Sequence, residues 1–208
     1  MTVYVLPGTD AAENLAQEGA FFRASRDCVL LWRNAPCVIL GKNQIAEQET
    51  SALCRETVPV LRRSTGGGAV YHDLNNINFS FLCTERVPHT MQEHAAPILA
   101  FLHALGLPAA FSGRNDILLC GKKISGMASR RKGDRTLVHG TLLFRCDSDA
   151  MDAYLTPDAD KLLRHGVPSV RARTGELAPD LPQFADAEQF LQALQKFLQN
   201  YKKTLDSL

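Results

Sequence analysis

The apolar residues of this chain recur in two spacings, one typical of helices and one typical of strands. Helices are predicted after Asp10, Thr90 and Asp186, because each is followed three positions later by Glu or Gln and then by a helical stripe of apolar side chains. The first helix should end near Ala24. Pro97 lies inside the second, and we expect a kink or a restart there because proline lacks a backbone donor.

Short runs of apolar, β-branched and aromatic residues predict strands in the first half of the chain. Cys28–Trp32 and Val38–Leu40 are separated by the turn-like sequence Asn34-Ala35-Pro36, so we expect them to pair with each other. A further strand is predicted at Val58–Leu61. Residues 76–82 alternate polar and apolar side chains, which is the pattern of a half-buried strand.

A β-hairpin is predicted between Ile117–Leu119 and Lys123–Ala128, with its turn at Cys120-Gly121. If Ile124 points into the core, the period of two directs Lys123 to the opposite face. The charged stretch Arg130–Arg135 follows this hairpin, and we expect it to form a solvated loop.

The composition is that of one globular domain, predicted to span residues 1–208. Hydrophobic residues make up 45% of the chain, enough for a core without cross-links. The net charge of +1 argues against nucleic acid as a partner. The chain contains no long apolar stretch, so we expect no membrane partner either. Six scattered cysteines include no C-x-x-C pair and no signal peptide opens the chain, so a reducing cytoplasm is expected.

The stretch from Arg62 to Asp73, with the sequence RRSTGGGAVYHD, carries the strongest functional signal. Three consecutive glycines cost conformational entropy in any regular element, so they indicate a turn where backbone N–H groups approach a ligand. Arg62 and Arg63 precede the glycines, and the planar fork of arginine suits phosphate or carboxylate. The spacing matches neither a P-loop nor a dinucleotide-binding motif. We predict an anionic ligand here, with a structural hairpin loop as the alternative.

Lys123 is the second functional candidate. An isolated lysine on an edge strand commonly serves to discourage aggregation. Here Asn115-Asp116 and Ser125-Gly126 would surround it with small polar groups, which favours a site. His139 interrupts a predicted apolar strand. Two interpretations fit it equally well, a buried histidine with hydrogen-bond partners inside the protein and a histidine that contacts the ligand.

His89 and His94 invite comparison with a metal-binding pair. Their spacing is five residues, whereas two zinc-binding histidines on one helical face are four apart. No third ligand lies nearby in the sequence, so the pattern disfavours a metal.

Five ordered motifs resemble the catalytic domain of the lipoate–protein ligase A family. They are Arg62–Asp73, Asn76–Phe81, Gly113–Asp116, Lys123–Ala128 and His139–Leu143. Asn14–Ala16 near the start and Ser169–Arg173 late in the chain also match, so the resemblance spans nearly all of it. Each motif alone would be weak evidence, but five at family spacing argue strongly against chance.

The resemblance implies an α+β fold of the class II synthetase and biotin-ligase type, with a mixed sheet flanked by helices. It also implies two half-reactions. MgATP adenylates lipoate with release of pyrophosphate, and the lipoyl group then passes from lipoyl-AMP to a lysine of an apo lipoyl domain. The acceptor would belong to a 2-oxoacid dehydrogenase or be the glycine-cleavage H protein.

The resemblance also assigns roles to residues. Lys123 matches the family's catalytic lysine, a fixed cation between the attacking carboxylate and the α-phosphate. Asp116 would hold Mg²⁺ or orient Lys123, and the sequence does not separate these roles. The residues matching the ATP and lipoyl-AMP site are Arg63, Gly66, Gly67, Gly68, Ala69, Val70, Tyr71, Asn115, Asp116, Lys123, His139 and Thr141.

The chain departs from the family pattern in two places. Asn75 stands where the family often has glycine, and Val138 stands where it has a second histidine. We also expect no C-terminal accessory domain, which many full-length ligases carry to support adenylation. The chain would then need a separate accessory-domain protein, use a preformed acyl-adenylate, or take acyl groups from another carrier.

Two other functions stay open. Related octanoyl and lipoyl transferases share the fold and use an exposed, activated cysteine as nucleophile. Only Cys120 and Cys83 are candidates here, and neither lies in the predicted strand 109–112, where that nucleophile is expected. The last alternative is a non-catalytic lipoate or nucleotide sensor, which the retained Lys123 disfavours. The sequence does not distinguish lipoate from octanoate.

Overall fold

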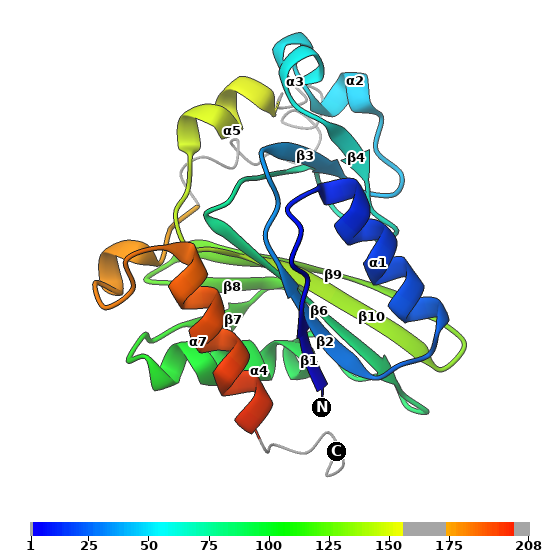
Figure 1. Ribbon diagram of the computed structural model, residues 1–208, viewed down its shortest axis with the longest axis vertical. Helices are drawn as coiled ribbons and strands as arrows, with labels where there is room; N and C mark the ends of the chain where they lie inside the picture. The colour runs from blue at the N-terminus through cyan, green and yellow to red at the C-terminus, as the bar shows by residue number, and fades with distance from the viewer. Residues whose placement is uncertain (1, 156–173, 202–208) are drawn as a thin grey trace.

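A computed structural model describes residues 2–155 and 174–201, and its centre is a seven-stranded mixed sheet (Figure 1). The first two strands in the order are parallel and all other neighbours are antiparallel. The strand order is β1 (Thr2–Val5), β2 (Cys28–Trp32), β6 (Asn76–Thr84), β10 (Arg135–Leu143), β9 (Lys122–Lys132), β8 (Asp116–Leu119) and β7 (Ala110–Ser112).

A second, three-stranded sheet contains β4 (Val60–Arg62), β3 (Cys37–Leu40) and β5 (Val70–His72) in that order. The expected pairing of Cys28–Trp32 with Val38–Leu40 is therefore wrong, because the two strands lie in different sheets. The chain crosses between the sheets at residues 33–36. The amide of Asn14 holds this crossover by donating to the Arg33 carbonyl and to the Asn34 side chain.

Helices cover both faces of the large sheet, as the resemblance implied (Figure 1). On one face α4 (Met91–Ala104) and α7 (Ala187–Asn200) bury the largest apolar cluster, which includes Phe101, Phe144 and Phe190. On the other face α1 (Ala11–Arg23) packs Phe22 against β2. The shorter helices are α2 (Ala46–Glu49), α3 (Ala52–Thr57), α5 (Ser148–Tyr154) and the 3₁₀ turn η2 (Ala178–Asp180).

All three predicted helices begin where expected. Thr90 forms a complete capping box with Glu93, while Asp10 and Asp186 each accept a hydrogen bond from the backbone three residues later. The restart expected at Pro97 does not occur, because α4 runs through it from Met91 to Ala104. None of the helices in the described ranges combines the length and apolarity that crossing a membrane requires.

Two strands differ from their predicted form. β6 is buried on both faces between Asn76 and Cys83. On its polar side Ser80 donates to Glu18 of α1, and Asn76 donates to Asp73, which follows β5 of the small sheet. The loop expected at Arg130–Arg135 is mostly strand, since β9 continues to Lys132. The turn between β9 and β10 is confined to Gly133 and Asp134, with Gly133 at φ +63°.

Candidate active site

The glycine loop, residues 64–69, leaves the small sheet after β4 and is braced from within by Arg63. This guanidinium is buried and donates to the Ile39, Gly66 and Gly68 carbonyls and to the Thr65 hydroxyl. Gly67 has φ +92°, which favours glycine. Glycine is also required at Gly41, where a Cβ would lie 2.0 Å from the Gly67 oxygen.

This bracing leaves the N–H groups of the loop available. Among the described residues, none of the N–H groups of Gly66, Gly67 and Gly68 donates a hydrogen bond. The three glycines are exposed, and a Cβ at Gly66 or Gly68 would meet no atom within 4 Å. Because Arg63 binds the Gly66 and Gly68 carbonyls, the loop presents N–H donors and open space, which suits an anionic group.

A β-bulge sets the direction of Lys123. β9 pairs Ser125 with Ile117 but Lys123 with Leu118, so Ile124 is an extra residue. Ile124 lies in the apolar core, and Ser125 is in register with Leu142 of the same core. Lys123 therefore lies on the sheet face opposite Ile124, as expected, together with Gly126. Ser125 was expected to surround Lys123 but lies on the core face instead.

The ammonium of Lys123 lies above Gly126. A Cβ at Gly126 would come within 2.8 Å of both Cε and Nζ of the lysine, so the missing side chain provides the space. Asp116, in register with Gly126, places Oδ1 2.7 Å from Nζ. The backbone N–H of Gly175 also donates to the Lys123 carbonyl, which anchors the start of β9.

The glycine loop and Lys123 lie over the same face of the large sheet. His139 Nε2 lies 2.6 Å from the Thr65 hydroxyl, which joins the loop to β10. Thr141 follows on the same side of β10 and is in register with Gly126. His139 is two residues from Thr141 along β10, and Gly126 lies one strand across from Thr141. The His139 side chain and the Lys123 ammonium are therefore roughly 10 Å apart. The structure brings together Gly66–Gly68, Asp116, Lys123, His139 and Thr141.

Glu18 of α1 is a buried member of this site that the sequence analysis missed. It lies 2.8 Å from His139 Nδ1 and accepts a hydrogen bond from Ser80. Burial acts to raise the pKa of Glu18, but the charge and hydrogen bond of His139, with the bond from Ser80, outweigh it and lower the pKa. The only sequence signal was the position of this glutamate on the same helical face as Ala11, Asn14 and Phe22.

His72 forms a second buried link, also missed. Its Nδ1 lies 3.1 Å from the Asn34 amide nitrogen, which can only donate, so Nδ1 is the acceptor. Nε2 then carries the proton and donates to Thr141, whose hydroxyl donates to Asn78. Burial, with the charges of Arg63 and His139, lowers the pKa of His72 to about 3.

Three predicted site residues use their side chains elsewhere. The Arg63 guanidinium faces the carbonyls of its own loop, and Asn115 donates to the Met127 carbonyl. The Tyr71 ring packs against Tyr154 in a separate apolar cluster, and burial raises its pKa to about 12. Ala69 and Val70 continue from the loop into β5. Contacts of these residues with a nucleotide stay predictions, and the matched motif at 169–173 lies outside the described residues.

Gly126→Ala should displace the Lys123 ammonium and leave the fold intact. The new Cβ would contact the mobile end of the lysine, which can move, so the free energy of unfolding should change by less than about 1 kcal/mol. If Lys123 is catalytic, activity should fall at least about tenfold because the cation is misplaced. Urea unfolding and steady-state kinetics test this. Unchanged kinetics would separate Gly126 from the reaction.

His72→Gln should weaken the dependence of stability on pH. Folded His72 stays neutral down to about pH 3, whereas in the unfolded chain histidine gains a proton below about pH 6.5. The unfolded state then binds more protons, so the free energy of unfolding falls as pH decreases. Between about pH 6.5 and pH 5 the wild type should lose about 1.5 kcal/mol more than the variant. Equal losses in urea titrations would contradict a neutral His72.

Comparison with known proteins assigns this architecture to a family. The family model described as the lipoyl protein ligase A/B catalytic domain matches residues 10–199. A curated relative from Mycoplasma pneumoniae, named "Probable lipoate-protein ligase A", is 37% identical over 174 residues. That match covers 81% of this chain and 51% of the relative, so the chain spans about half the relative's length.

Solved structures agree with this match. Plasmodium falciparum LipL1 in complex with lipoate is 30% identical with a TM-score of 0.80, over 95% of this chain and 61% of that one. A lipoate-protein ligase A bound with ATP is 25% identical with a TM-score of 0.77, over 96% and 86%. A bi-partite lipoate protein ligase from Thermoplasma acidophilum, described with its E2 lipoyl domain, is 25% identical with a TM-score of 0.74, over 95% and 83%.

Proposed function

Because the chain belongs to the lipoyl protein ligase A/B catalytic domain family, we propose that it is an ATP-dependent lipoate–protein ligase. In this proposal it activates lipoate as lipoyl-AMP and transfers the lipoyl group to a lysine of an apo lipoyl domain. The relatives solved with lipoate and with ATP support both small-molecule substrates. The free cysteines of the chain fit a reducing cytoplasm as its location.

The observation that carries the proposal is the position of the Lys123 ammonium. It is paired with Asp116, lies in the space left by Gly126 and shares a sheet face with His139, which contacts Thr65 of the glycine loop. A cation held in this way needs no reorganisation when an anion arrives. Lys123 therefore suits a reaction in which two anions must approach each other.

Adenylation is such a reaction. The lipoate carboxylate oxygen attacks the α-phosphorus of ATP, and the bond to the bridging oxygen of pyrophosphate breaks. Lys123 would neutralise the carboxylate and the α-phosphate as they meet. The free N–H groups of Gly66–Gly68 would bind phosphate oxygens, and the open space above Gly66 and Gly68 would admit the ligand.

Asp116 fits a magnesium ion held mainly by the nucleotide. Mg²⁺ in such sites binds one or two protein carboxylates together with phosphate oxygens and water, and it neutralises phosphate charge. Asp116 offers one carboxylate beside Lys123, with about a third of its side chain exposed. Its second task would be to hold the Lys123 ammonium in place.

In the transfer step, the ε-amine of the acceptor lysine attacks the acyl carbon, an amide forms and AMP leaves. The acceptor would be a lipoyl domain of a 2-oxoacid dehydrogenase or the glycine-cleavage H protein. The Thermoplasma acidophilum ligase, described as bi-partite and with an E2 lipoyl domain, supports this partner class. It also supports a separate accessory-domain protein as a partner for a catalytic domain of this size.

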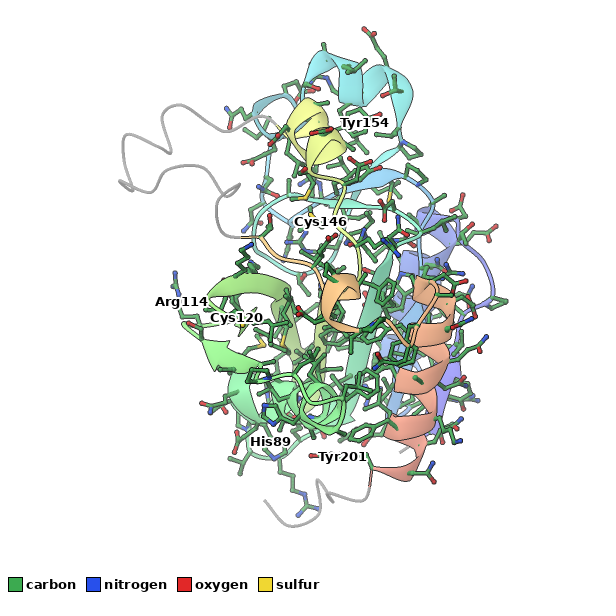
Figure 2. All side chains as sticks on the ribbon, turned by 90° about the vertical axis from the view of Figure 1, so that its left-hand side faces the viewer. His89, Arg114, Cys120, Cys146, Tyr154 and Tyr201 are labelled. Atoms are coloured by element: carbon green, nitrogen blue, oxygen red, sulfur yellow. The ribbon has the colours of Figure 1, made fainter. Side chains whose placement is uncertain are left out.

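A cysteine-dependent acyltransferase is the second candidate, and the cysteines argue against it. Cys83 is buried, and burial raises its pKa to about 12, so it is a poor nucleophile. Cys120 is exposed at the β8–β9 turn (Figure 2). Its φ of +49° fits its place in a two-residue turn with Gly121. β7 contains no cysteine.

Cys120→Ala should therefore leave adenylation and transfer within about twofold of the wild type, because an exposed turn residue contributes little to stability. The measurement is the mass of the acyl-acceptor domain after reaction with lipoate and ATP, and separately with an octanoylated carrier protein. A large loss with the carrier alone would favour the transferase.

One assay tests the proposed function. Purified protein is mixed with lipoate, ATP, Mg²⁺ and an apo lipoyl domain, and pyrophosphate release and domain mass are followed. A domain with its acceptor lysine changed to arginine is the control. Pyrophosphate with an acylated domain supports the ligase, and acylation from synthetic lipoyl-AMP alone restricts the chain to transfer. Binding without either step would favour the sensor and overturn the proposal. Octanoate in competition measures acyl preference.

A further inference from the structure

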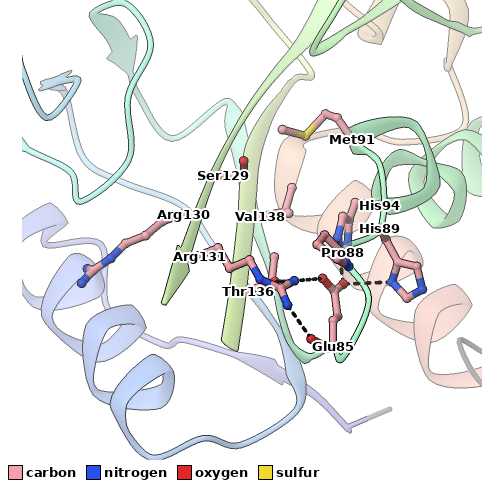
Figure 3. Close-up of a pocket in the computed structure, with 10 residues that line it drawn as sticks. All are labelled: Glu85, Pro88, His89, Met91, His94, Ser129, Arg130, Arg131, Thr136 and Val138. Atoms are coloured by element: carbon pink, nitrogen blue, oxygen red, sulfur yellow. Dashed lines mark hydrogen bonds and ion pairs between the residues drawn. The ribbon is translucent and has the colours of Figure 1, made fainter. Parts of the chain in front are cut away.

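A cluster of cysteine, glutamate and histidine side chains lies at the far end of the large sheet, where β6 passes into the loop before α4 (Figure 3). Lys123 and Arg131 are eight residues apart on β9, so this cluster lies roughly 26 Å from the candidate active site. Cys83 and Glu85 are two residues apart, at the end of the strand. His89 and His94 come from the loop and the first turns of α4.

Both histidines converge on one oxygen of Glu85. His89 Nδ1 and His94 Nε2 each lie 2.9 Å from Glu85 Oε1. Nitrogen, carboxylate oxygen and sulfur atoms of His94, Glu85 and Cys83 all lie within 4.8 Å of one another. Figure 3 shows the two imidazoles directed toward the carboxylate from one side.

Burial makes this convergence unusual. The side chains of Glu85 and His94 are 2% and 3% exposed. His94 Nε2 is within ion-pair distance of the carboxylate but outside hydrogen-bonding geometry, so this buried nitrogen has no hydrogen-bond partner within the described residues. Buried polar atoms without partners are rare because they lose their hydration, and a missing ion is one explanation.

Arg131 approaches the same carboxylate from the other side (Figure 3). Its Nη1 lies 3.5 Å from Glu85 Oε2, and its Nη2 donates to the Glu85 carbonyl at 2.7 Å. The guanidinium thus forms an ion pair with Oε2, which has no hydrogen bond within the described residues, while Oε1 faces the histidines. Ligating carboxylates commonly have such an outer partner. A thiolate and a carboxylate would neutralise a divalent ion, so Arg131 would face a centre without net charge.

We propose that Cys83, Glu85, His89 and His94 form a structural zinc site. One sulfur, two imidazole nitrogens and one carboxylate oxygen make a donor set that Zn²⁺ accepts in tetrahedral geometry. Tetrahedral bonds of ordinary length place ligand atoms about 3.3 to 3.6 Å apart. The ligand atoms of Cys83, Glu85 and His94 already lie within 4.8 Å of one another, so small shifts suffice for these three, and the His89 side chain would turn inward to complete the site. Binding forms a zinc–sulfur bond and releases the thiol proton to solvent.

The site would fix the connection between β6 and α4. A cavity of about 110 Å³ beside Glu85, His89 and His94 gives the ion access. The sequence pattern disfavoured a metal because the other two ligands precede the histidines, with Cys83 near the end of β6 and Glu85 just after it. Alternation places Cys83 and Glu85 on one side of that strand, which the spacing of the histidines alone does not reveal.

Cobalt(II) tests the site in the intact chain, because a cobalt–thiolate bond has a charge-transfer absorption. We expect one equivalent of Co²⁺ to produce this band, Zn²⁺ to remove it, and Zn²⁺ to raise the melting temperature of chelator-treated protein. Cys83→Ser should lose the band. Glu85→Gln, which keeps the shape of the side chain, should weaken zinc binding at least about tenfold, measured by competition with a chelating dye.

Cys120→Ser is the matched control, because it removes an exposed thiol and should leave both signals unchanged. Circular dichroism shows whether each variant is folded. If Cys83→Ser is unfolded, the zinc affinity of Glu85→Gln tests the site instead. A band that persists in folded Cys83→Ser, or zinc affinity equal to wild type in Glu85→Gln, would overturn the site. So would the absence of cobalt and zinc binding by the wild type.

Discussion

Lys123→Ala is expected to lower the rate of adenylate formation about a thousandfold. Removing one preorganised donor from a site of developing negative charge typically costs a hundredfold to a thousandfold, and Lys123 carries a full charge. The fold should persist, because the side chain is about one-third exposed and its pairing with Asp116 is partly solvated. Lipoate-dependent exchange of pyrophosphate into ATP measures the first half-reaction alone.

Lys122→Ala is the matched control for that experiment. Lys122 is the neighbouring lysine, is exposed and lies on the other side of β9, so exchange should stay within about twofold of the wild type. Retention of more than a tenth of the exchange rate by Lys123→Ala, with the variant folded, would mean that another cation carries the reaction.

Arg63→Lys is expected to lower the free energy of unfolding by about 3 kcal/mol. Lysine keeps the charge but cannot reach the Ile39, Gly66 and Gly68 carbonyls together, and hydrogen bonds to a charged group contribute about 1.5 to 3 kcal/mol each. At this chain length the melting temperature should fall by roughly 6 to 12 °C. Urea unfolding measures the change, and hydrogen exchange at residues 66–68 locates it.

Arg62→Lys provides the comparison within the same pair of arginines. Arg62 also donates to backbone carbonyls, those of Gly41, Lys42 and Gln44, but its side chain is exposed. Water can replace its hydrogen bonds, so the loss should be below about 1 kcal/mol. Similar losses in the two variants would show that burial of Arg63 does not determine the stability of the loop.

Local signals in the sequence predicted the parts of the fold that depend on neighbouring residues. The three capping residues, the β8–β9 turn at Cys120-Gly121 and the orientation of Lys123 opposite Ile124 are confirmed by the structure. These features are decided within a few residues by dihedral angles and side-chain alternation. The family was also recognisable, because its motifs lie where the chain needs special backbone or a buried polar contact.

Long-range arrangements were not predictable in the same way. The crossover that separates β2 from β3 is hydrogen-bonded by the buried amide of Asn14, which lies 19 and 20 positions away in sequence. The contacts of Glu18 with His139 and of His72 with Thr141 join residues separated by 121 and 69 positions. No spacing rule reports such pairs. Arginine near glycines suggested a ligand for Arg63, but the sequence does not indicate that its donors bind the loop itself.

The extra residue at Ile124 has a consequence for comparing this strand with its relatives. A homologous strand lacking one of the two bulge residues would pair regularly and still direct its lysine to the same side. A one-residue gap at this place in an alignment would therefore not count against a shared mechanism. A one-residue gap between Met127 and Lys132 would count against it, because alternation along β9 would then turn Lys123 to the other side of the sheet.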